Sequence, residues 1–155
     1  MDNYFLLKVL HILSATILTG TGVGIAFFMF MTWRSGNTEA IQVTTRHVVL
    51  ADWIFTAPAV VIQFVTGLLL ANRLGIAMLS PWMLAVTGLF IFIGCCWLPV
   101  VWIQYKLRAM AGDEQFEREQ FDRYMRLWTA LGIPAFTALL VVYWLMVFKP
   151  LAMTQ

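Results

Sequence analysis

A single imidazole, that of His11, lies inside the first long apolar segment of the chain, LLKVLHILSATILTGTGVG. Transferring an imidazole into hydrocarbon is costly, so an ionisable residue within a membrane-spanning helix marks a functional site by default. A neutral imidazole nitrogen can ligate a metal ion, and it can also accept or donate a proton. His11 is therefore the leading candidate for the chemistry of this protein and its candidate metal ligand.

Small and polar residues share the helical face of His11. Close by, Gly20 and Gly24 form a G-x-x-x-G pair. Such a pair most often permits close approach of two helices, but it also gives room to a flat ligand such as a porphyrin, and both interpretations stay open. The residues at helical spacing on this face are His11, Ser14, Leu18, Thr21 and Gly22.

The second apolar segment carries a longer polar stripe. Its members fall within about a third of the helical circumference, and polar groups in a membrane should face the bundle interior. Counted by helical rise, Gln63 lies at about the same depth in the membrane as His11, and Asp52 lies near the opposite, cytoplasmic surface of the membrane. We expect a polar pocket around His11, although interhelical hydrogen bonds that only pack the helices explain the stripe equally well. The stripe consists of Asp52, Thr56, Ala59, Gln63, Thr66 and Gly67.

The remaining histidine and the two cysteines are weaker candidates. Antiparallel helices place His47 opposite the end of the first segment, so much of the ~30 Å hydrocarbon separates His47 from His11. We expect His47 at the membrane interface and not as a partner of His11. Cys95 and Cys96 are adjacent in an apolar run, which is typical of packed helix residues and not of a disulfide or a metal motif.

The composition decides which elements position these residues. Of 155 residues, 61% are hydrophobic and 12% are charged, and the mean hydropathy is +0.82. Too few polar side chains remain to cover a soluble domain, so the chain is expected to be an all-α integral membrane protein. The net charge of +2 and the dispersed basic residues exclude nucleic-acid binding.

Four apolar segments are long enough to cross the membrane, since crossing takes about 20 helical residues. We expect the first segment to be retained, because it is too long for the core of a signal peptide and has no small-residue cleavage site. The stretch AMAGDEQFEREQFDR predicts a helix stop at Gly112 and Asp113, followed by a solvated extension of the fourth span. Residues 1–155 thus form a single four-helix bundle with predicted spans at 4–32, 43–72, 81–105 and 124–148.

The distribution of Lys and Arg predicts the orientation of the bundle. Cytoplasmic loops carry an excess of these residues. The excess lies on the first and third connections, so we place those connections in the cytoplasm and both termini on the non-cytoplasmic side. Seven basic residues flank them (Arg34, Arg46, Lys106, Arg108, Arg118, Arg123 and Arg126), against Lys8, Arg73 and Lys149 at the other side.

Four segments, in this order, resemble the HemJ type of protoporphyrinogen oxidase, a small integral membrane family that binds haem b. They are LKVLHILSA, TAPAVVIQFVTGLLL, PWMLAVTGL and YMRLWTALGIPAFTALLVVYWLMVFKP. The chain is more similar still to the uncharacterised integral membrane families grouped with HemJ and with the copper-resistance protein CopD. The best anchors are the context of His11, the spacing from Pro58 to Gly67, and the closing Lys149-Pro150. The resemblance implies that His11 is a haem ligand.

The chain also departs from the HemJ pattern. The family has a Lys shortly after a Trp in the third helix, whereas only Met, Leu and Ala follow Trp82 here. The family's Asn-Glu pair before the fourth-helix Pro is replaced by apolar residues and Gly132 before Pro134. Its Tyr-His pair in the third helix is replaced by the apolar region around Trp97. These departures argue against protoporphyrinogen oxidation, while the haem ligand is kept.

Together these observations favour a membrane-embedded, haem b-binding redox protein. His11 would be the axial ligand, Ser14 and Gly22 would line the cofactor, and Gln63 and Thr66 would orient the ligand or face a substrate. Electrons would pass between the haem and a quinone, a porphyrin-like substrate or a partner oxidoreductase. The expected location is the bacterial cytoplasmic (inner) membrane.

Two other functions stay open on the sequence. One is a small-solute or copper permease of the CopD kind, for which the stripe from Asp52 to Gln63 would line a path. The other is a non-catalytic accessory subunit whose glycine faces bind other helices, including those of a second copy in a homo-oligomer.

Overall fold

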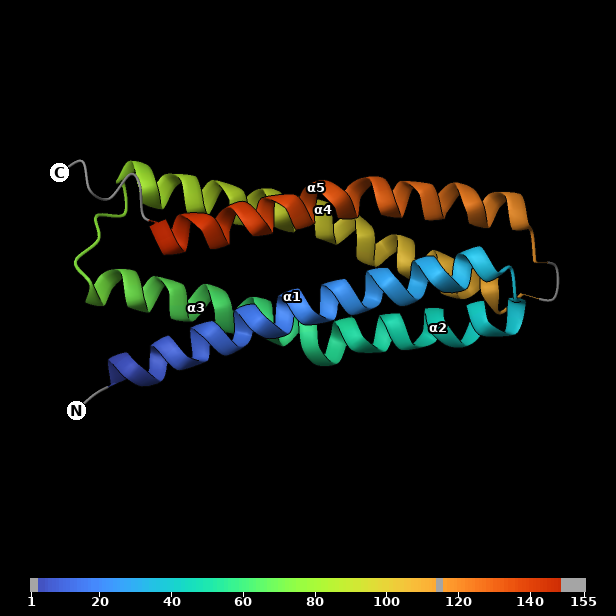
Figure 1. Cartoon of the computed structure of the whole chain (residues 1–155), viewed down its shortest axis with the longest axis horizontal. Coiled ribbons are helices and arrows are strands. Elements are labelled where there is room, and N and C mark those ends of the chain that lie inside the picture. The colour runs from blue at the N-terminus through green and yellow to red at the C-terminus, as the bar shows by residue number, and fades with distance from the viewer. Residues whose placement is uncertain (1–2, 114–115, 149–155) are drawn as a thin grey trace.

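The computed structural model describes residues 3–113 and 116–148, and its elements are all helical (Figure 1). Four helices are long and apolar enough to cross a membrane, which confirms the predicted all-α membrane bundle. Lys149 and Pro150, cited above, lie outside the described residues. The elements are α1 (Asn3–Ser35), α2 (Thr38–Ala51), the π-helical turn η1 (Asp52–Thr56), α3 (Ala57–Arg73), α4 (Pro81–Ala111) and α5 (Arg118–Phe148).

Large apolar side chains cover the outside of the bundle. Phe28 is 63% exposed, Leu98 66% and Val147 75%, and they are three of many such residues on all four long helices. A protein surrounded by water rarely exposes so extensive an apolar surface. The surface is instead suited to lipid, and the chain is an integral membrane protein.

The helices are longer than the predicted spans, and the extra turns lie at one end. α1 continues to Ser35, α2 begins at Thr38, α4 continues to Ala111 and α5 begins at Arg118. At about 1.5 Å per residue a 31-residue helix is ~46 Å long, more than the ~30 Å of hydrocarbon. The charged, amphipathic sequence next to each span therefore continues the helix into water.

Local sequence signals fix the helix ends. Ser80 caps α4 by accepting a hydrogen bond from the backbone N–H of Met83 (3.3 Å), with Pro81 in the first turn, as Ser-Pro predicts. Asn37 caps α2 in the same way, since its side chain accepts from the N–H of Ala40 (3.0 Å). Gly36, with φ +68°, makes the preceding turn.

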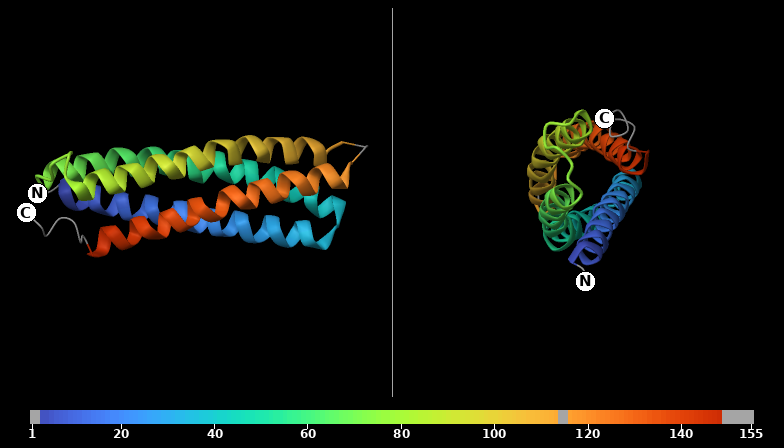
Figure 2. Two further views of the ribbon diagram at one scale, coloured as in Figure 1. Left: turned by 90° about the horizontal axis from the view of Figure 1, so that it is seen from above. Right: turned by 90° about the vertical axis from the view of Figure 1, so that its left-hand side faces the viewer.

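The two ends of the bundle differ. α1 begins and α5 ends at what we call the terminal end, while the α1–α2 and α4–α5 connections lie at the opposite, basic end (Figure 1). α1 packs along α2, η1 and α3, α4 packs along α5, and α2 joins the two groups by packing on α4 (Figure 2). The larger apolar core lies toward the basic end; its most buried members are Ile41, Ile103, Leu107, Phe121 and Met125.

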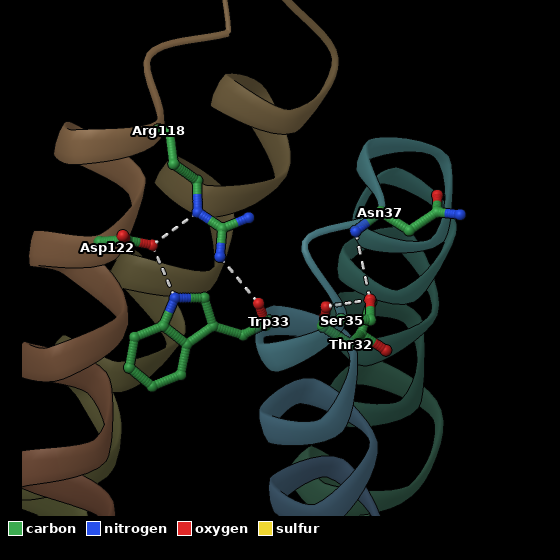
Figure 3. A network of polar contacts seen from close by, with 6 residues as sticks. All are labelled: Thr32, Trp33, Ser35, Asn37, Arg118 and Asp122. Atoms are coloured by element: carbon green, nitrogen blue, oxygen red, sulfur yellow. Dashed lines mark hydrogen bonds and ion pairs between the residues drawn. The ribbon is translucent and has the colours of Figure 1, made fainter.

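A polar clasp joins the end of α1 to the start of α5 at the basic end (Figure 3). The indole N–H of Trp33 donates to Asp122 Oδ1 (2.7 Å), which also accepts from Arg118 Nε (2.9 Å). Arg118 donates in addition to the backbone carbonyl of Trp33 (2.8 Å), one of the carbonyls that a helix end leaves unpaired. The clasp closes the basic end around the core.

The second span contains one irregular turn. Between α2 and α3, the N–H of Ala57 donates to the carbonyl of Asp52, five residues earlier, which makes η1 a π-helical turn. Pro58, just after this turn, lacks an N–H, and its ring would crowd the carbonyl four residues before it. A widened turn relieves that crowding, and such turns are frequent at functional sites. Sequence analysis did not predict η1.

Candidate functional site

The side chain of His11 projects from α1 toward α3 in the terminal half of the bundle, and both of its ring nitrogens are hydrogen-bonded. Its Nδ1 lies 2.9 Å from Thr66 Oγ1, and its Nε2 lies 3.0 Å from the Gln63 side-chain nitrogen. Ser14, one turn along α1, donates to Gln63 Oε1 (2.5 Å). The predicted common depth of His11 and Gln63 is therefore confirmed. We call these four residues, His11, Ser14, Gln63 and Thr66, the histidine network.

The donors and acceptors of the histidine network form one ordered chain. Thr66 donates its hydroxyl hydrogen to the backbone carbonyl of Ile62 (2.6 Å), so its oxygen is left to accept from His11 Nδ1–H. Gln63 accepts from Ser14 through Oε1 and donates from its amide N–H to His11 Nε2. Ser14 Oγ also lies 3.0 Å from a second acceptor, the backbone carbonyl of His11. When Ser14 donates to Gln63, the network matches a neutral imidazole with hydrogen on Nδ1 and a lone pair on Nε2.

Burial and close packing hold the network in place. Ser14 is 2% exposed and Thr66 is 4% exposed, so their hydroxyl groups have no access to water. Gly67 lies directly against the ring, and a Cβ added there would be 3.2 Å from His11 Cε1. A side chain at position 67 would make a tight contact with the imidazole, so glycine here lets the ring pack directly on α3.

The hydrogen bonds of His11 are of the kind that surround metal-ligating histidines. A metal-binding histidine usually donates its other ring N–H to a fixed acceptor, which orients the ring and keeps the ligating nitrogen unprotonated. Thr66 provides that acceptor for Nδ1, and Nε2 has the lone pair. Nε2 is engaged by the amide of Gln63, so ligation requires the Gln63 side chain to move aside.

Around His11 the structure has interhelical hydrogen bonds, which were the alternative to a polar pocket. The ring is packed against Gly67 and bonded to two side chains, because α1 and α3 pack directly on each other. Two open surface hollows, of about 420 and 530 Å³, lie toward the basic end. The first is lined among others by Arg46 and Arg108, and the second by Arg123 and Arg126. Neither belongs to the histidine network.

The glycines of α1 do not bring two helices of the chain together. A Cβ built at Gly20, Gly22 or Gly24 would meet no heavy atom of the described residues within 4 Å. The expectation of close helix packing through Gly20 and Gly24 is therefore wrong within one chain. Gly22 lies two turns beyond Ser14, about 12 Å along the helix, and is separate from the histidine network.

The polar stripe of the second span divides between two neighbouring helices. Its far part, Gln63 and Thr66, faces α1, as described. Its near part also faces the bundle interior, as expected, since Asp52 is 6% and Thr56 9% exposed, and it lies against Trp97 and Gln104 of α4. Asp52 is 11 residues from Gln63, about 16 Å along the helix, so these are two separate polar sites.

Sequence analysis missed the α4 side of this second site. Gln104 is only 2% exposed, although it lies beyond most of the apolar run of its helix. A lone amide near the end of an apolar span was the available signal, and Asp52 on the neighbouring span was its natural counterpart. We call Asp52, Thr56, Trp97 and Gln104 the aspartate cluster.

Of the other candidates, Cys96 is packed as expected, whereas Cys95 is not. His47 is exposed on α2, Cys95 is exposed and Cys96 is buried, and both cysteines are free. In the described parts of the chain, no group of three or more His, Cys, Asp or Glu residues is placed to hold a metal ion. A multi-ligand metal centre of that kind is thus not formed by residues 3–113 and 116–148.

Comparison with known proteins assigns a family. The chain belongs to the family described as "Predicted integral membrane protein (DUF2269)", whose model matches residues 5–150. This match agrees with the membrane class of the resemblance noted above and does not extend to HemJ or CopD. No curated protein and no solved structure matches the chain.

Proposed function

We propose that this DUF2269 membrane protein binds haem b through His11 and acts in one-electron redox chemistry in the bacterial cytoplasmic membrane. The observation that carries the proposal is the state of the His11 ring. It is a neutral imidazole inside a span, with Nδ1–H held by Thr66 and a lone pair on Nε2. When bound, haem would supply a redox couple whose potential depends on ligand identity and burial.

The residues around His11 have separate roles in this proposal. Thr66 fixes the ring orientation and the tautomer, because its own hydroxyl hydrogen is committed to the Ile62 carbonyl. Gly67 gives the ring room to lie against α3. Gln63, held by Ser14, covers Nε2 and keeps the lone pair hydrogen-bonded when no ligand is there.

The division of the polar stripe favours this function over a permease. Between Thr56 and Gln63, the stripe passes through Ala59, which is 2% exposed. A solute path would need continuous polar or open lining, and here the two polar sites are separated by close packing. Quinones, porphyrin-like substrates and partner oxidoreductases remain the classes of molecule that would exchange electrons with the haem.

Visible spectra of the detergent-purified protein test the proposal. After expression with ample haem, the wild type should show a Soret band that shifts on reduction, and His11→Ala should lose it. His47→Ala is the matched control and should keep the band. Absence of a band in the wild type would refute haem binding, and an undiminished band in His11→Ala would refute the ligand.

A third variant separates the roles of Gln63 and His11. In Gln63→Leu the amide no longer competes for Nε2, so haem occupancy should equal or exceed that of the wild type. If the band is lost instead, Gln63 is required for haem binding and does not merely cover the ligand.

Complementation of a strain without protoporphyrinogen oxidase should fail, because the Lys and Asn-Glu groups of HemJ are replaced here.

A further inference from the structure

The aspartate cluster contains four buried polar atoms for which the described residues supply no hydrogen-bond partner. They are Asp52 Oδ2, Thr56 Oγ1, Trp97 Nε1 and Gln104 Oε1. Asp52, Thr56 and Gln104 are each at least nine-tenths buried. The Thr56, Gln104 and Trp97 side chains lie close enough to the Asp52 carboxyl group to interact with it, but these four atoms do not reach direct hydrogen-bond geometry. Buried polar groups are nearly always paired, so such a concentration of unpaired atoms needs an explanation.

The four atoms complement one molecule of water. Asp52 Oδ2 and Gln104 Oε1 are acceptors, the indole N–H of Trp97 is a donor, and the hydroxyl of Thr56 can donate. A water molecule offers two hydrogens and two lone pairs, and buried waters typically make about three hydrogen bonds to otherwise unpaired groups. We propose that the aspartate cluster is a binding site for a single water molecule between the second and third spans.

The chemistry of the cluster favours water over a metal ion. A cation would be coordinated by the oxygen atoms, but it would leave the indole N–H of Trp97 unpaired and would be repelled by it. Asp52 is also the only carboxylate in the cluster, whereas hard divalent cations collect several charged oxygen ligands. Water satisfies the donor and the acceptors together.

The π-helical turn explains why the site lies here. Asp52 and Thr56 are the first and last residues of η1, so the widened turn presents both side chains toward α4. The water site is separate from the histidine network and does not depend on haem binding.

Two measurements on the full-length protein in lipid nanodiscs test this site. A structure at a resolution that shows ordered water should contain one density peak among the four atoms. Radiolytic hydroxyl labelling in H₂¹⁸O should oxidise Trp97 several-fold faster than Trp82. Trp82 is the internal comparison, because its indole N–H already donates to the carbonyl of Leu145 (2.9 Å).

Variants connect the labelling to the site. Thr56→Val with Gln104→Leu removes two of the water's partners and should reduce Trp97 labelling several-fold, while Thr137→Val, on the outer face of α5, should not. Direct hydrogen bonds among the four side chains, with no density peak, would overturn the proposal. A second result would also overturn it. If NaCl, but not choline chloride, raises the melting temperature of the wild type, and neither salt raises that of Asp52→Asn, the site holds a sodium ion.

Discussion

The second span carries two polar sites that differ in how their hydrogen bonds are completed. In the histidine network, the side chains of α1 and α3 satisfy one another directly. In the aspartate cluster, four buried atoms have no partner among the described residues. Both sites have a threonine and a long amide side chain, so the residue types alone do not produce the difference.

The difference comes from what the neighbouring helix supplies. α1 provides an imidazole with one donor and one acceptor, together with the Ser14 hydroxyl, and these match Gln63 and Thr66. α4 provides the Trp97 donor and the Gln104 amide on either side of a wide π-helical turn. A network in which every donor and acceptor is paired holds one geometry and one tautomer. A cluster with unpaired buried atoms needs a further molecule to complete its hydrogen bonds.

The largest effect is expected for the centre of the histidine network. His11→Leu should lower the free energy of unfolding by about 2–3 kcal/mol, because the buried amide N–H of Gln63 loses its acceptor. His11→Leu combined with Gln63→Leu should recover part of this loss. Thermal unfolding in detergent measures the stability of the wild type, the two single variants and the double variant. If the losses of the single variants simply add in the double variant, the two side chains do not depend on each other.

Packing against the ring gives the next effect. Gly67→Val should cost about 1–2 kcal/mol, because its Cβ alone would lie too close to His11 Cε1 and the ring must shift. Gly22→Val is the matched control within the same fold and should change stability by no more than about 0.5 kcal/mol, since the space beside it is open. Equal effects at the two positions would contradict the described contact.

The smallest effects compare the two threonines of the second span. Thr66→Val leaves His11 Nδ1–H without its acceptor and should cost about 1 kcal/mol, within the range for hydrogen bonds between membrane helices. Thr56→Val removes one partner of a replaceable water and should cost at most about 0.5 kcal/mol. A larger loss at Thr56 than at Thr66 would reverse the comparison between the sites.

Much of the fold and the common depth of two site residues could be predicted from the sequence. Hydropathy located the four spans, and helical rise placed Gln63 beside His11, because regular helices convert residue number into depth. The Ser80-Pro81 signal marked the start of α4 for a similarly local reason. These features depend on short-range sequence patterns.

Features that depend on two helices at once could not be predicted. Gly20 and Gly24 have the pattern of a close-packing motif, yet a Cβ built at either would meet no heavy atom of the described residues within 4 Å. Gln104 and Trp97 face Asp52 only because α2 packs on α4, and a single segment does not encode that pairing. Pro58 disfavours a regular turn before it, but both a kink and a π-helical turn relieve that crowding, so the residue alone does not determine which one forms.

The π-helical turn η1 also determines how this chain can be aligned with its relatives. It accommodates one more residue than a regular turn, so it behaves as a one-residue insertion relative to a regular helix. Deleting one residue between positions 52 and 56 would let this segment close as a regular turn, so that the helix on either side keeps its faces and only the side chains of the turn itself change direction. A relative that lacks the extra residue would therefore present a different side chain to α4, even where its histidine network is unchanged.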